Sequence, residues 1–265
     1  MKQPTIESIN DWIEDSYESL ARKDRLAQEG FREKHNLPLE GLYRTKGEYY
    51  QDIAICQALL GDKDKAREAL YLSVEYGIVP YRMAYDEHCD LRHQTAKPGQ
   101  NHYMSLPETT AQLYAMAALD DEGFNKDNLR FVRLMESIEN DTESLEMVQT
   151  VRALCFMMDE DKDAAAEAVL KIALDHSQVH PVKGGWRART YVINLGLWGI
   201  VRKEQNTFDE ALGLLLKNYE KESKGEMRDM PGAYVCLIAV GLIKLARRYG
   251  LTYEDKHPLI PSALL

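Results

Sequence analysis

The sequence predicts an all-α fold of stacked antiparallel helical hairpins, and three observations lead to that prediction. Apolar residues recur at steps of three and four along almost the whole 265-residue chain, as they do on the buried face of a helix. The strict apolar–polar alternation of strands is almost absent. Short polar turns separate successive helical segments, and such turns fold neighbouring helices back on each other. With 45% hydrophobic and 29% charged residues, the composition is that of a globular protein.

The N-terminal half begins with an expected amphipathic helix over residues 5–34. A first helical hairpin is expected over residues 45–77. Its start is predicted from Thr45 and Glu48, which have the spacing of a capping box, and its turn from Gly61.

Two further hairpins are expected over residues 142–176 and 186–222. In the second helix of all three hairpins an alanine precedes a larger apolar residue by four positions, which lets neighbouring helices nest closely. These pairs are Ala66 and Leu70, Ala165 and Val169, and Ala211 and Leu215. The pattern resembles that of tetratricopeptide repeats without a regular spacing between hairpins. It predicts a tetratricopeptide-like superhelical array of divergent repeats, forming one all-helical domain over residues 1–265.

The C-terminal part is expected to form a buried helix over residues 231–249, because that segment is apolar on most sides. The tail over residues 251–265 contains two prolines and is expected to be extended and docked on the protein surface. Residues 78–107 are the least regular segment, and their role is left open.

Charge and composition limit the kinds of partner. The formal net charge of -10 favours a basic partner and disfavours nucleic acid and anionic membranes, although acidity also serves solubility alone. Residues 1–10 lack the apolar core of a signal peptide, and the longest apolar stretch is too short to span a bilayer. The four cysteines are scattered without a CxxC pair. We therefore expect a cytoplasmic protein that binds neither nucleic acid nor membrane.

Motifs for catalysis and metal binding are weak. The chain has no phosphate-binding glycine loop, no HExxH and no GxSxG. Cys89 with His88 or His93 could form a nucleophilic or zinc site, but on a helix residues 88 and 93 would point about 140° apart. His176 and His180 have zinc-ligand spacing without a third ligand. We expect no enzymatic activity, no cofactor and no metal.

Tyrosines point instead to a protein-contact surface. Nine of the fifteen lie between Tyr43 and Tyr114, and tyrosine and arginine dominate interface hot spots. Tyrosines can equally fill a helical core with their hydroxyls reaching outward, and for Tyr49, Tyr71 and Tyr76 the helical spacing favours the core. The predicted partner-binding residues are Tyr81, Arg82, Tyr85, His88, His93 and Tyr103.

Two C-terminal segments, "NTFDEALGLLLKNYEKES" and "GAYVCLIAVGLIKLARRYGLTYEDKHPLIPSALL", resemble the immunity protein 49 family of bacterial polymorphic-toxin systems. In that family a helix with a Phe/Ala/Leu stripe precedes a long apolar helix, a charged helix end, a glycine and a proline-containing tail. Here these features are Phe208, Ala211, Leu212, the segment 234–246, Arg247, Arg248, Gly250, Pro258 and Pro261. The segment "ALLGDKDKAREAL" is similar to the N-terminal half of the family.

The resemblance implies a cognate immunity protein that binds a delivered toxin domain in the cytoplasm and occludes its active site. An acidic inhibitor suits a basic toxin such as a nuclease, because opposite charges speed encounter. One alternative is a tetratricopeptide-like adaptor or regulatory protein that binds a peptide or protein partner. A weaker alternative is an enzyme that uses Cys89 with a histidine. The sequence leaves the toxin-binding surface and the oligomeric state open.

Overall fold

The computed structural model describes residues 3–92, 104–134, 144–159, 161–179, 185–225, 227–254 and 256–265. Within these ranges all regular structure is helical and no strand occurs, so the all-α prediction is confirmed. The helices are α1 (Ile6–Gln28), α2 (Phe31–Lys34), α3 (Leu39–Leu59), α4 (Lys63–Tyr85), α5 (Leu106–Leu119), α6 (Glu122–Asn128), α8 (Leu145–Met158), α9 (Asp163–Val179), α10 (Gly185–Val201), α11 (Gln205–Glu222) and α12 (Leu237–Arg248). Short 3₁₀ turns are η4 (Leu129–Phe131), η5 (Pro231–Ala233) and η6 (Ser262–Leu264).

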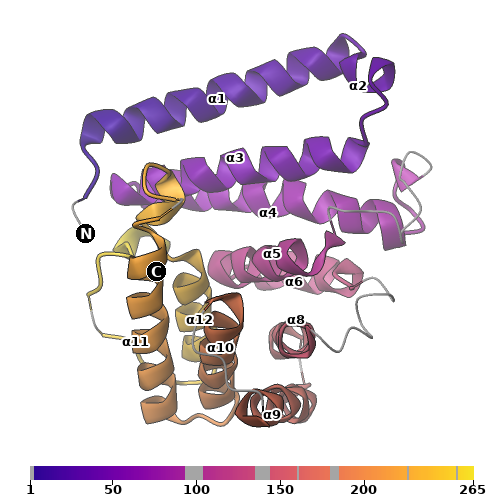
Figure 1. Cartoon of the computed structure of the whole chain (residues 1–265). Coiled ribbons are helices and arrows are strands. Elements are labelled where there is room, and N and C mark those ends of the chain that lie inside the picture. The colour runs from indigo at the N-terminus through magenta and orange to yellow at the C-terminus, as the bar shows by residue number, and fades with distance from the viewer. Residues whose placement is uncertain are drawn as a thin grey trace.

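The three predicted hairpins are present as the pairs α3–α4, α8–α9 and α10–α11. Figure 1 shows α1, the α3–α4 pair and the α5–α6 pair as successive layers, with α10, α11 and α12 running crosswise to them. Helix α12 packs mainly on α5, which precedes it by more than a hundred residues. The array is therefore closed by a long-range contact in addition to contacts between sequence neighbours.

Small residues lie where helices approach most closely. A methyl group added to Gly47 would lie 2.9 Å from a main-chain oxygen of α4, and one on Gly199 would lie 2.7 Å from a main-chain nitrogen of α11. On Gly241 of α12 it would lie 3.0 Å from a main-chain oxygen of α5. Side chains larger than hydrogen would push these helices apart, since such contacts are shorter than van der Waals separation.

The alanine seam is confirmed in α4 and α11, where both members of each predicted pair are buried. In α9 the predicted register is wrong by one residue: Ala166 and Leu170 are buried, whereas Ala165 and Val169 are only partly covered. Residues 164–166 are all alanine, so the sequence offered several candidate pairs. The buried pair is set by which face of α9 meets α8 and α10.

Two boundaries of the first hairpin differ from the prediction. Helix α3 starts at Leu39 after Pro38, so Thr45 lies inside the helix and the predicted capping box does not cap it. Helix α4 runs through Pro80 to Tyr85 rather than ending at residue 77. A proline removes one helical hydrogen bond, and here continued burial of the apolar face beyond it keeps the helix intact.

The predicted helix over residues 5–34 is divided at Gly30, whose positive φ of 68° ends α1 and starts α2. The predicted C-terminal helix starts later than expected, at Leu237, because η5 and a turn precede it. Its burial is confirmed, and so is docking of the tail: the backbone N–H of Cys236 donates to the carbonyl of Leu259 at 2.9 Å. In the described part of the chain, every helix is too short or too polar to cross a bilayer.

Candidate partner-binding groove

A groove of about 620 Å³ opens between α4 and α6. Helix α4 contributes Tyr71, Glu75, Tyr76, Ile78, Val79 and Arg82, and the segment around α6 contributes Asp121, Phe124, Asp127 and Asn128. We call this surface the α4–α6 groove. Its two walls belong to different layers of the array (Figure 1).

A tight turn between α5 and α6 positions the second wall. Asp120 ends α5 in the left-handed conformation, with φ 57°, which short polar residues tolerate better than most. The next residue, Asp121, is the N-cap of α6, and its carboxylate accepts the backbone N–H of Phe124 at 3.0 Å. The turn thereby presents both Asp121 and Phe124 to the groove.

The groove carries uncompensated negative charge. Asp121 has a cationic neighbour in Arg67, at 3.5 Å. Glu75 and Asp127 also line the groove, and neither has a cationic partner within 4 Å among the residues that the structure describes. The positive charge that lines the groove, Arg82, is already neutralised by a carboxylate outside it.

Arg82 is held at the edge of the groove by Asp86. Its Nε and Nη2 donate to the same carboxylate oxygen of Asp86, at 3.2 and 3.1 Å, and its guanidinium lies 5.9 Å from the ring centroid of Phe131. The backbone N–H of His88 donates to the other Asp86 oxygen at 3.0 Å. This backbone hydrogen bond, and then those from Arg82, lower the pKa of Asp86. The pair is therefore a fixed structural unit.

Aromatic rings form much of the remaining wall. Tyr71 is 39% exposed and packs edge-on against Phe124, with ring centroids 5.6 Å apart. Tyr76 stacks almost parallel on Tyr50, at 5.4 Å, and lies 6.2 Å from Tyr43. The interpretation of Tyr71 as a core residue is wrong. Residues spaced three and four apart on a helix include both buried residues and the exposed residues at the edge of the buried face, so the spacing alone does not distinguish them.

Tyr81, predicted to contact a partner, lies in the core instead. It is 1% exposed, and its hydroxyl donates to the Thr109 hydroxyl at 2.9 Å. Burial raises the pKa of Tyr81. The prediction for this residue is wrong because α5 packs on α4 and covers Tyr81, and the local sequence around Tyr81 does not show this contact.

The other predicted contact residues divide into three groups. Arg82 lines the groove. Tyr85 is partly buried, with the guanidinium of Arg133 5.7 Å from its ring centroid, and His88 is exposed in the turn after α4. His93 and Tyr103 lie outside the described residues.

Within the ranges that the structure describes, the candidate catalytic and metal-binding residues do not form a site. Cys89 lies in the turn after α4, where its backbone N–H donates to the Asp86 carbonyl at 3.2 Å. Of its two candidate partners, His88 is exposed in the same turn and His93 lies outside the described residues, as does His180, the candidate partner of His176. In the described ranges no group of three or more His, Cys, Asp or Glu could hold a metal ion.

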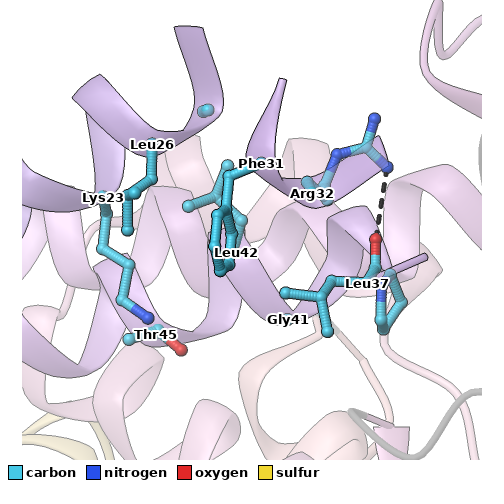
Figure 2. Close-up of a pocket in the computed structure, with 10 residues that line it drawn as sticks. Lys23, Leu26, Phe31, Arg32, Leu37, Gly41, Leu42 and Thr45 are labelled. Atoms are coloured by element: carbon cyan, nitrogen blue, oxygen red, sulfur yellow. Dashed lines mark hydrogen bonds between the residues drawn. The ribbon is translucent and has the colours of Figure 1, made fainter. Parts of the chain in front are cut away.

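A smaller pocket of about 200 Å³ lies at the corner between α1, α2 and α3. Figure 2 shows Leu26, Phe31 and Leu42 facing one another there, with Arg32 donating to the Leu37 carbonyl at 3.4 Å. This pocket is mainly apolar, with lysine and arginine as its charged lining residues. A basic partner would therefore favour the α4–α6 groove.

Comparisons of the chain with protein-family models, with curated proteins and with solved structures find no match.

Proposed function

We propose that this protein is a cytoplasmic immunity protein that binds a basic toxin domain and occludes its active site, using the α4–α6 groove. The observation that carries the proposal is the pair of uncompensated carboxylates, Glu75 and Asp127, in a groove with the exposed ring of Tyr71. The C-terminal resemblance to the immunity protein 49 family supports the choice of a toxin as the partner.

The chemistry of the groove suits an arginine or lysine side chain of the partner. A guanidinium can donate to carboxylates while its flat face packs on an aromatic ring. Groove walls exclude water and so strengthen both interactions. The net charge of -10 would in addition steer a basic domain toward the protein. Loss of a desolvated interfacial charge pair typically costs about 2–5 kcal/mol, enough to release a partner of moderate affinity.

The proposal is tested by co-expressing the protein with the C-terminal domain of any toxin-like protein that a neighbouring gene encodes. Growth rescue and a complex that co-purifies are the expected results. The double variant Glu75→Lys with Asp127→Lys should lose both. The matched control is Asp11→Lys with Glu14→Lys, which makes the same charge change at exposed positions of α1.

Equal rescue by the two double variants would show that the α4–α6 groove is not the binding site. Absence of rescue and of a complex with the wild-type protein would reject the immunity function. Capture of several unrelated proteins would favour the adaptor alternative.

A further inference from the structure

Another cavity, of about 270 Å³, lies where α3, α5, α8, α10, α11 and α12 meet. We propose that this central cavity binds a small amphipathic carboxylate, with the carboxylate between Arg189 and Tyr114 and the apolar tail against Ile193, Leu237 and Ile238. This inference is independent of the α4–α6 groove and of the proposed function, since the two sites share no lining residue.

The polar end of the cavity offers hydrogen-bond donors. Arg189 uses Nη1 to pair with Glu222 at 2.7 Å, and each of the two side chains is 36% exposed. A guanidinium has five N–H donors, so this ion pair leaves others for a ligand. A carboxylate could accept two of them in a bidentate arrangement.

Tyr114 supplies an independent indication of a ligand. It is only 5% exposed, it lines the cavity, and no group in the part of the chain that the structure describes forms a hydrogen bond with its hydroxyl. The hydroxyl is not among the side-chain atoms that are fully shut off from solvent, so it opens onto the cavity and can donate a hydrogen bond to a ligand there. Burial raises the pKa of Tyr114, while the positive charge of Arg189 acts in the opposite direction. The hydroxyl is therefore protonated at neutral pH and can donate to a carboxylate.

The three threonines of the cavity do not compete as donors. The hydroxyls of Thr110, Thr150 and Thr190 donate to main-chain carbonyls four residues earlier in their own helices, at 2.7, 2.8 and 2.9 Å. The proton of each threonine hydroxyl is thus already used in a hydrogen bond within its own helix. The donors left to a ligand come from Arg189, Tyr114 and the amide of Gln51, which also lines the cavity. Such a set favours a ligand whose head group only accepts hydrogen bonds.

The size of the cavity limits the ligand. An apolar cavity of about 150 Å³ holds benzene, with six heavy atoms, so 270 Å³ corresponds to about ten heavy atoms. Octanoate has that size and the required polarity, and it serves as the probe. Octanol and octylamine carry the same tail with a neutral and a cationic head.

The test measures binding to the full-length protein by isothermal titration calorimetry and by thermal unfolding. Octanoate should bind and raise the melting temperature, because a ligand of the folded state stabilises it. It should bind at least tenfold more tightly than octanol, and octylamine should bind more weakly than either. Tyr114→Phe and Arg189→Met should each weaken octanoate binding at least tenfold and leave octanol binding within twofold of wild type.

Tyr114→Phe keeps the ring and removes only the hydroxyl, so it remains informative if Arg189→Met fails to fold. Ile193→Trp, which fills the apolar end, should abolish binding of all three probes. The inference is overturned if octanoate does not bind at millimolar concentration, if the three probes bind equally, or if Tyr114→Phe binds octanoate like wild type.

Discussion

The close contact between α10 and α11 allows us to predict how much stability the protein loses when Gly199 is replaced by alanine. A methyl group on Gly199 would lie 2.7 Å from the main-chain nitrogen of Phe208 and 3.2 Å from its Cα. Backbone atoms cannot rotate away, so Gly199→Ala must separate the two helices. Overpacking of this kind costs about 1–3 kcal/mol. The contact predicts a value near the upper end of that range.

Gly213→Ala is the matched control, because Gly213 lies in α11, is exposed, and has nothing within 4 Å of an added methyl group. Both substitutions gain the same helix propensity, about 0.5–1 kcal/mol. The difference between the two variants therefore isolates the contact. At about 2–4 °C per kcal/mol for a chain of this size, a cost of about 3 kcal/mol places the two melting temperatures about 6–12 °C apart.

The assay is thermal and urea unfolding followed by circular dichroism at 222 nm. Gly213→Ala should unfold at a slightly higher temperature and urea concentration than wild type. Gly199→Ala should unfold at a lower temperature and urea concentration than Gly213→Ala. If the two variants were equally stable, the claim that glycine permits this approach of α10 and α11 would be refuted.

Two further predictions concern buried polar groups. Burial, and then the neighbouring carboxylate of Glu48, raises the pKa of Asp52 to about 6. The folded state therefore binds the Asp52 proton more tightly than the unfolded state, and stability is lost as pH rises from about 4 through 6. By urea unfolding, Asp52→Asn should be more stable than wild type by about 3 kcal/mol at pH 7.5 and no more stable at pH 3.5. A stability difference that does not change with pH would contradict this. Tyr81→Phe removes the buried hydrogen bond to Thr109 and should lower the unfolding free energy by about 1 kcal/mol. Its affinity for the partner, measured by titration, should equal that of wild type. A loss of affinity at unchanged stability would show that Tyr81 contacts the partner.

Helical hairpins could be predicted from the sequence because spacing of apolar residues and short turns are local signals. Their boundaries could not: Thr45 and Glu48 have capping-box spacing inside a continuous helix, and Pro80 is tolerated within α4 because the flanking turns are buried. Helix α5 was not identified, since it is covered on nearly all sides and shows no single apolar stripe. A helix of that kind has weak periodicity.

The α4–α6 groove is formed by residues that lie far apart in the sequence, so local sequence patterns do not predict it. Of the predicted contact residues, Arg82 lines the groove. Tyr81 and Tyr71 were assigned to the opposite environments, because which face of α4 is covered depends on α5 and α6. Glu75 and Asp127 were not singled out, since their proximity arises from the turn at Asp120.

The most direct test of the proposed binding site is site-specific photo-crosslinking to the toxin domain. A benzophenone side chain would replace Tyr71 in the α4–α6 groove or, as a control of equal exposure, Leu214 on α11; both wild-type residues are 39% exposed. A covalent adduct with the toxin domain from position 71 and none from position 214 is the predicted result. Crosslinking from position 214 and none from position 71 would contradict the account.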